Sequence, residues 1–419
     1  MKKIWKNLIK GIIRLWRRET LVLIAILTLF LSIFSVLSNI PERASIEEQA
    51  VANDSSSLRV IFDNPVNAPY KLATYGLTAL SPSIRLVRAV SYIFYIGACI
   101  AMFYALRHWH TLQTSVITTA AFATNSVVLA VGRLGTTLIT VMSFFIFSSM
   151  LLWQLHTHSN KFVPIIVLIA VGSLLYTPGA IWFFLILSVV YFNRFKKLFN
   201  DVKRPAIIFG VAISAILLAP LIISFVRDID TLNQWLLIPS NFDTSEIPRS
   251  ILRLPSAFIY RMPIEPIINV GRLPIFDIAS GILFLIGLNA YRRKLKLDRT
   301  KVMIGSAIVA IVVGALGELT VSVIILLPFA YSIIAAGIEY LLDEWYSVFP
   351  RNPYARSFGL LLITSVMLFS IYYQMTRFFV VWPQAPETRA IYNQSRIIYD
   401  SPPTDTIEVE KGEFTNESR

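Results

Sequence analysis

Two adjacent carboxylates, Glu47 and Glu48, stand in the polar segment that follows the first long apolar run of the chain. Adjacent like charges raise each other's pKa when they are partly desolvated. A carboxylate held just outside a membrane can act as a general base toward an acceptor hydroxyl, or can help to hold a divalent cation. The alternative is that both are ordinary solvated loop carboxylates. We take Glu47 and Glu48 as the candidate catalytic residues.

Basic and aromatic residues follow the acid pair in the same segment. The prolines and asparagines of residues 64–69 are typical of a turn, and residues 70–79 predict an amphipathic helix at the membrane interface. Cations next to that helix could bind a phosphate near the level of the lipid headgroups. The alternative is ordinary snorkelling of long basic side chains. The candidate substrate-binding residues of this segment are Tyr70, Lys71, Arg85 and Arg88.

Arg133 lies between Gly132 and Gly135 in a predicted tight turn between two long apolar runs. A guanidinium in that position suits a phosphate, although a phospholipid headgroup would satisfy it equally well. A second polar stretch, residues 227–273, mixes aromatic and charged side chains that would suit a sugar and a phosphate. The alternative is an amphipathic segment that covers the outer face of the protein and binds nothing. Further candidates for substrate contact are Arg261, Arg272 and Glu318, the last in a turn between two later apolar runs.

The composition places the chain in a membrane. Of 419 residues, 55% are hydrophobic and 15% are charged, and the mean hydropathy is +0.64. Soluble domains carry about 25% charged residues. The formal net charge of +13 would suggest nucleic acid in a soluble protein, but here the cations lie in short segments between apolar runs, where membrane orientation explains them. The single cysteine, Cys99, excludes an intramolecular disulfide.

The apolar runs predict an all-α polytopic membrane protein with about eleven transmembrane helices. The predicted spans are about 20–40, 86–106, 112–132, 136–155, two short spans within 162–192, 205–226, 274–290, 302–317, 319–341 and 357–380. They divide the chain into a basic segment 1–19, a transmembrane domain 20–380 with outer loops 41–85 and 227–273, and a polar tail 381–419.

Charge sets the predicted orientation. The densest Lys and Arg clusters fall at 1–18, 194–204 and 292–301. Positive clusters stay on the cytoplasmic side, so we expect a cytoplasmic N-terminus, an extracytoplasmic C-terminus and a site outside the cytoplasm. The expected location is the cell membrane.

Several function classes lose support. The chain has no Walker or GxGxxG loop, so nucleotide binding is not expected. His108 and His110 lack accompanying cysteine or acidic ligands, as do His156 and His158, so no metal-binding residues are predicted. The few charges within the spans argue against a proton-coupled pump, and the lack of internal repeats weakens a transporter interpretation.

The order of these features resembles the GT-C superfamily of membrane glycosyltransferases, and most of all its protein mannosyltransferase and lipid A aminoarabinose transferase branch. Residues 46–50 match a D-E-x-A pattern with Glu for Asp, and residues 67–70 loosely match the H-P-P-L-Y element that follows it. Residues 85–90, with Arg85 and Arg88, resemble the R-L-P-S stretch that enters span two. Gly132-Arg133 resembles the arginine turn after span three, and residues 176–178 the break of a split span pair. The likeness covers about residues 1–200.

The resemblance implies transfer of a sugar from a polyprenyl-phosphate-linked donor to an acceptor on the extracytoplasmic face. It implies Glu47 as the base, Glu48 as its neighbour and Arg133 as a phosphate ligand, with a divalent metal ion as a cofactor in some members. The expected partners are the lipid-linked sugar and membrane lipid, and no nucleic acid.

Two departures keep other functions open. Thr136, Thr137 and Thr140 stand where many relatives carry an acid, and Glu47 is one methylene longer than the family aspartate. A non-catalytic GT-C-like protein that binds a polyprenyl lipid or assembles a complex is the second hypothesis. A transporter of lipid-linked sugars is the third.

Overall fold

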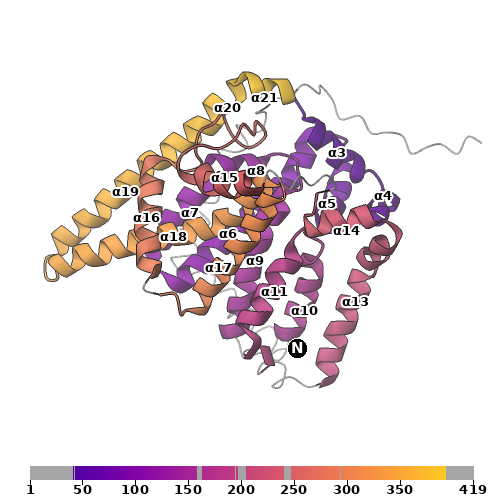
Figure 1. Ribbon diagram of the computed structural model, residues 1–419, viewed down its shortest axis with the longest axis horizontal. Helices are drawn as coiled ribbons and strands as arrows, with labels where there is room; N and C mark the ends of the chain where they lie inside the picture. Colours follow the sequence, from indigo (N-terminus) through magenta and orange to yellow (C-terminus); the bar gives the residue numbers. More distant parts are fainter. Residues whose placement is uncertain are drawn as a thin grey trace, which may run out of the picture.

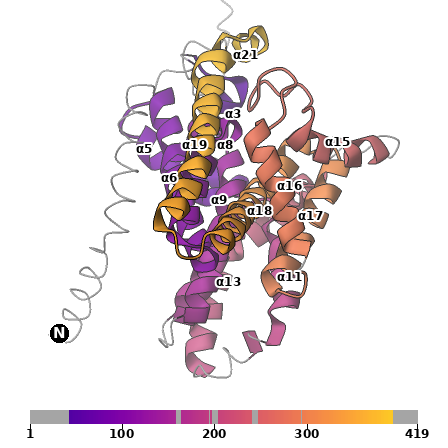
Figure 2. The same cartoon turned by 90° about the vertical axis from the view of Figure 1, so that its left-hand side faces the viewer.

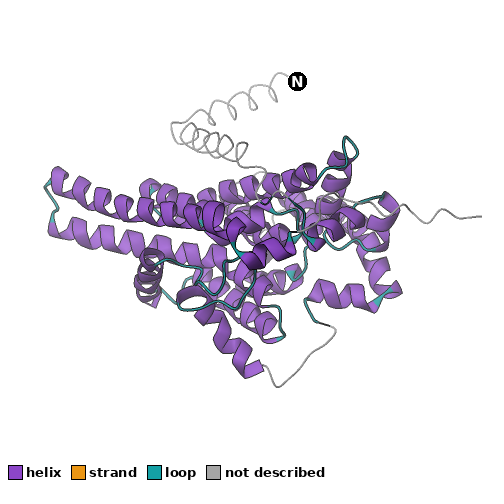
Figure 3. Cartoon of the chain, turned by 90° about the horizontal axis from the view of Figure 1, so that it is seen from above, coloured by secondary structure: helices purple, strands orange, loops and turns teal. Residues whose placement is uncertain are grey.

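A computed structural model describes residues 41, 43–157, 163–193, 195–196, 204–239, 247–292 and 294–392. Regular structure in these ranges is helical (Figure 3). The basic segment 1–19, the first predicted span at about 20–40 and the tail from residue 393 lie outside the described residues.

The first loop folds into three short helices, α3 (Ile46–Asp54), α4 (Leu58–Asp63) and α5 (Ala68–Thr78). Serines begin the first two, because a serine hydroxyl accepts a hydrogen bond from an amide of the first turn. Ser45 Oγ accepts from the Glu48 amide at 3.1 Å, and Ser57 Oγ accepts from the Val60 amide at 3.3 Å. α5 lies where the amphipathic helix was predicted, at residues 70–79. The polar loop is therefore largely helical.

The third predicted span is broken in the structure. After α6 (Ile84–Trp109), the chain forms α7 (Leu112–Thr124) and α8 (Ser126–Arg133), which are bent by 63° relative to each other. Asn125 causes the break: its side chain accepts from the amides of the next helix and donates to the Ile275 carbonyl at 3.3 Å. The prediction of one continuous helix over 112–132 is therefore wrong at Asn125. Arg133 is the last residue of α8 and is buried, and the predicted turn follows it at residues 134–137.

Most of the remaining helices follow the predicted apolar runs, with the run 162–192 divided at its Thr-Pro-Gly turn, whereas α14 (Ile229–Leu236) and α15 (Ile247–Ile259) lie in the second polar stretch, residues 227–273. The helices in the apolar runs are α9 (Leu138–Thr157), α10 (Val163–Leu174), α11 (Ala180–Val190), α13 (Arg204–Arg227), α16 (Ile278–Arg292), α17 (Asp298–Ala315), α18 (Leu319–Val348) and α19 (Pro353–Thr376). Figure 1 shows α18 within the bundle and α13 and α19 on opposite sides of it.

Among the described residues, four helices are long and apolar enough to cross a membrane, or five if the bent pair α7 and α8 forms one span. α18 is the most enclosed of them, whereas α13 and α19 expose most of their apolar side chains, as a helix facing lipid does. The total of eleven spans and the orientation stay predictions.

The C-terminal end departs from the predicted polar tail. The chain continues from α19 through the π-helical η2 (Arg377–Val381) into α20 (Trp382–Gln384) and α21 (Pro386–Ile391). Figures 1 and 2 both place α21 beside α3. Trp382 is 1% exposed and Tyr392 is 5% exposed, so the part of the predicted tail up to residue 392 is helical and packed against the protein. The physical reason is that two large aromatic side chains bury apolar area against the bundle.

Two glycines allow α16 and α18 to cross at close range. A Cβ added at Gly287 would lie 2.0 Å from the Ile333 carbonyl oxygen, and one added at Gly337 would lie 2.1 Å from the Leu283 carbonyl oxygen. Small residues allow membrane helices to approach backbone to backbone. The crossing carries α18 through the centre of the bundle.

Replacing Gly337 with alanine is therefore expected to destabilise the protein by about 1–3 kcal/mol or more, because neither backbone can move away without the other. Gly281→Ala on α16 is the control, since its added Cβ would meet nothing within 4 Å. Gly281→Ala should leave stability unchanged or raise it by about 0.5–1 kcal/mol. Thermal unfolding in detergent measures both, and equal melting temperatures for the two variants would contradict the close crossing.

Candidate functional site

Glu48 is the centre of the polar network in the first loop. It is the third residue of α3 and is fully buried. Its Oε2 accepts from the Ser45 amide at 3.1 Å while the Ser45 hydroxyl accepts from the Glu48 amide, which is a capping box. Its Oε1 accepts from the Gly135 amide at 2.8 Å. The carboxylate thus joins the start of α3 to the segment just after α8.

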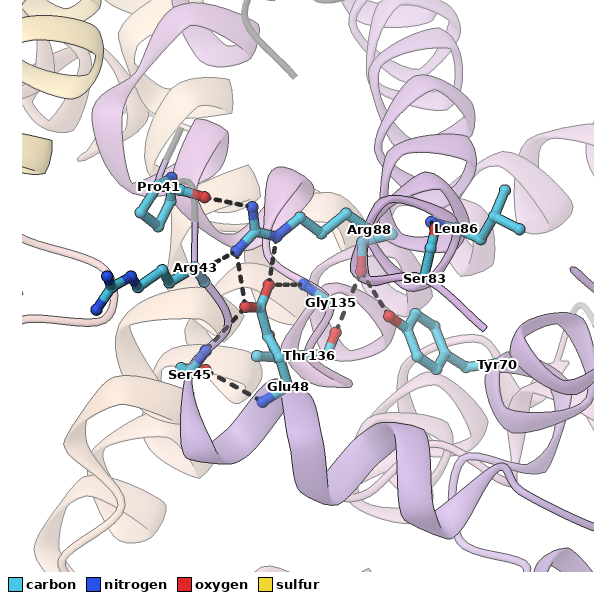
Figure 4. A network of polar contacts seen from close by, with 11 residues as sticks. Pro41, Arg43, Ser45, Glu48, Tyr70, Ser83, Leu86, Arg88, Gly135 and Thr136 are labelled. Carbon is cyan, nitrogen blue, oxygen red and sulfur yellow. Dashed lines mark hydrogen bonds and ion pairs between the residues drawn. The ribbon is translucent and has the colours of Figure 1, made fainter. Parts of the chain in front are cut away.

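Arg88, one turn into α6, holds the same carboxylate with two parallel hydrogen bonds (Figure 4). Nε lies 2.7 Å from Glu48 Oε1, and Nη2 lies 2.8 Å from Oε2. The remaining donors bind main-chain carbonyls, Nη1 that of Pro41 at 2.6 Å and Nη2 that of Arg43 at 2.9 Å. Both oxygens of Glu48 are engaged, so this carboxylate is not free to take a proton from an acceptor. Glu48 and Arg88 thus bind each other and the main chain around them, and the catalytic and phosphate-binding roles predicted for them stay predictions.

Tyr70 and Lys71 are likewise bound within the protein. The Tyr70 hydroxyl lies 2.6 Å from Ser91 Oγ, and its side chain is fully buried. Lys71 Nζ lies 3.0 Å from Asp54 Oδ2 and donates to the Asn64 carbonyl at 3.0 Å. We therefore place both side chains in the framework rather than in contact with substrate, which revises their predicted role.

Thr140, one of the residues that replace the family acid, ties the first loop to α9. Its hydroxyl lies 2.7 Å from Asn67 Oδ1, and the Asn67 amide donates to the Tyr176 carbonyl at 2.8 Å. Asn67 has a φ of 61°, a left-handed conformation that asparagine tolerates better than most residues. The neutral hydroxyl of Thr140 thus helps to hold the first loop in its position and conformation.

Arg133 ends α8 next to this network. The side chain is 1% exposed, and its guanidinium carbon lies 5.8 Å from the centre of the Phe379 ring in η2. It interacts electrostatically with Arg88 and Glu48. A first-loop acid and Arg133 therefore lie within electrostatic range of each other, and that acid, Glu48, is the one that Arg88 holds.

Glu47 is the carboxylate of the pair that retains an exposed face. Partial burial raises its pKa, and the nearby charges of Glu265 and then Glu48 add to that rise. Burial likewise raises the pKa of Glu265, a hydrogen bond with Thr320 opposes the rise, and the charge of Glu318 adds to it. The structure thus brings Glu47 close to Glu265, an acid from a distant part of the chain, and Glu265 in turn lies close to Glu318. Glu265 was not among the predicted site residues, and no local motif marks it.

Three predicted arginines stay at the surface. Arg85, Arg261 and Arg272 are exposed, and none belongs to the contacts in Figure 4. Within the part of the chain that the structure describes, no three His, Cys, Asp or Glu side chains are arranged to hold a metal ion.

Replacing Glu48 with glutamine is expected to destabilise the protein by about 3–5 kcal/mol, because it leaves the Arg88 charge buried and uncompensated. Arg85→Gln, three residues earlier on the same helix, removes an exposed charge and should change stability by less than about 0.5 kcal/mol. Thermal or denaturant unfolding of the purified protein measures the difference. A Glu48→Gln variant as stable as Arg85→Gln would show that the buried pair does not hold the loop.

Comparisons with known proteins bear on the fold. No protein-family model matches the chain. No curated protein sequence matches it. Two crystal structures of ArnT from Cupriavidus metallidurans are similar to it, each with a TM-score of 0.57 and each aligned over 87% of this chain and 78% of ArnT. The apo structure is 13% identical in sequence, and the structure bound to undecaprenyl phosphate is 14% identical. The chain is therefore an all-α polytopic membrane protein whose fold resembles that of ArnT.

Proposed function

We propose that the protein is a glycosyltransferase that moves a sugar from a polyprenyl-phosphate-linked donor to a hydroxyl acceptor on the extracytoplasmic face. The observation that carries the proposal is the first-loop arrangement, in which the bound Glu48 interacts electrostatically with the buried Arg133 while its neighbour Glu47 keeps an exposed face and a raised pKa. The shared fold with ArnT, one structure of which holds undecaprenyl phosphate, supports the donor class.

In this proposal Glu47 is the general base. Successive residues of a helix are rotated by about 100°, so the hydrogen bonds that fix Glu48 inward turn Glu47 to another side of α3. The pKa of Glu47 is raised toward neutral pH. A general base works best when its pKa lies near the working pH, because it is then deprotonated and still basic enough to accept a proton. Glu47 takes the proton of the acceptor hydroxyl as the hydroxyl oxygen bonds to the anomeric carbon of the sugar.

Arg133 is proposed to act on the leaving group. As the new bond forms, the bond between the anomeric carbon and the phosphate oxygen breaks, and its electron pair leaves with the polyprenyl phosphate. A cation nearby stabilises the negative charge that grows on that oxygen. One displacement of this kind inverts the anomeric carbon.

A non-catalytic lipid-binding protein of the same fold is the second candidate. The observation that favours it is the set of threonines after Arg133, where Thr140 holds the loop in place of an acid. Binding of a polyprenyl-phosphate sugar without transfer to any acceptor would decide for it.

Glu47→Gln is expected to lower sugar transfer by about 100-fold or more while leaving the melting temperature unchanged, because it removes the base and keeps the shape. Transfer from a radiolabelled polyprenyl-phosphate sugar in membranes is the measurement. Asp63→Asn is the control, since it removes another exposed acid of the same loop. Full transfer by Glu47→Gln would remove this residue from the base role.

Glu265→Gln is expected to move the acidic limb of the pH–rate profile to lower pH. The negative charge of Glu265 helps to raise the pKa of Glu47, so neutralising it lowers that pKa. A base works when deprotonated, and its rate falls as pH drops through its pKa. The variant should therefore keep its activity further into acid. Glu344→Gln, an exposed acid of α18, is the control. If the acidic limb of the Glu265→Gln variant stays in place or shifts to higher pH, the proposed interaction between Glu265 and Glu47 is contradicted.

A further inference from the structure

The segment from Arg377 to Tyr392, here called the C-terminal cap, is fastened to the loop before α16 at two places. Arg377 Nη1 donates to the Pro274 carbonyl at 2.6 Å, and Trp382 Nε1 donates to the Pro266 carbonyl at 2.8 Å. Trp382 also stacks on Phe378, with ring centres 5.2 Å apart and planes inclined by 13°. Pro266 follows Glu265, the acid near Glu47, so the cap is held against the candidate site.

Tyr392 ends this cap and turns its ring onto Trp382, with centres 5.5 Å apart and planes at 74°. Its side chain is 5% exposed, and its buried hydroxyl has no hydrogen-bond partner among the described residues. A buried tyrosine hydroxyl usually has a partner, so this one indicates a group that the protein itself does not supply.

The surroundings of Tyr392 belong to the candidate site. The residue interacts electrostatically with Glu48, Arg88 and Glu47. Two further buried hydroxyls lack a partner in the described residues, Thr388 one turn earlier on α21 and Thr136 directly after Gly135. Unpartnered hydroxyls therefore come from the cap and from the segment that contacts Glu48.

We propose that the Tyr392 hydroxyl donates a hydrogen bond to a phosphate oxygen of the lipid-linked donor, which makes the C-terminal cap part of the donor site. This inference rests on the proposed function.

The chemistry of the hydroxyl favours a phosphate. Burial, and then the charge of Glu48, raise the pKa of Tyr392 well above its usual value, so the phenol stays neutral and offers a proton for hydrogen bonding. Phosphate oxygens are stronger acceptors than sugar hydroxyls. Arg133, which lies over Phe379 at the start of the cap, supplies a positive charge on the same side. The same phosphate chemistry is present in a phospholipid headgroup, so the test separates the two sources.

The test compares the full-length wild-type protein with Tyr392→Phe in detergent. Binding of undecaprenyl phosphate and of phosphatidylglycerol is measured by titration for each. Phenylalanine keeps the ring against Trp382 and removes only the hydroxyl. We expect Tyr392→Phe to bind undecaprenyl phosphate about tenfold more weakly, to bind phosphatidylglycerol unchanged and to melt at or above the wild-type temperature. Tyr372→Phe, on the exposed face of α19, should bind both lipids as the wild type does.

Other outcomes are distinguishable. Equal binding of undecaprenyl phosphate by wild type and Tyr392→Phe would overturn the inference and leave the proposed function standing. A loss confined to phosphatidylglycerol would make the hydroxyl a contact for a structural lipid and would also overturn it. A wild-type protein that does not bind undecaprenyl phosphate would overturn both the inference and the proposed function.

Discussion

The buried ion pair of Glu48 and Arg88 is the interaction on which the arrangement of the site depends. Moving two charges out of water is costly, and the cost is offset only by good geometry and by hydrogen bonds to the remaining donors and acceptors. Here Arg88 binds the carboxylate with two hydrogen bonds and two main-chain carbonyls as well, while two amides donate to Glu48. One pair thereby links α3, α6 and the segment after α8.

The ion pair also gives the two adjacent acids, Glu47 and Glu48, different environments. Glu48 is bound on both oxygens and sets where α3 lies, whereas Glu47 keeps an exposed face and a raised pKa. Two neighbouring carboxylates in one short helix thus have different environments, and the environment rather than the residue type sets the role of each.

The sequence predicted the parts of this arrangement that depend on local pattern. Apolar runs located most of the helices, and the amphipathic pattern located α5. The S-x-x-E spacing of Ser45 and Glu48 is a capping-box signature, and it would have shown from the sequence that Glu48 turns back toward the main chain. That signal distinguishes Glu48 from Glu47 without any structure.

Other features depend on tertiary contacts that no local pattern carries. The break at Asn125 is completed by the distant Ile275 carbonyl, and the environment of Glu47 depends on Glu265. Tyr392 lies in a stretch whose polar composition predicted a tail, and two aromatic residues were enough to fold that stretch back onto the bundle. Sparse aromatic residues in a polar segment give too weak a pattern to predict such docking.

The distribution of charge connects these features to chemistry. Glu48 pairs with Arg88 and also lies within electrostatic range of Arg133, while Glu265 lies within electrostatic range of Glu47 and of Glu318. In the proposed transfer, negative charge grows on the leaving oxygen while a proton departs from the attacking one, so the reaction needs both a cation and a base.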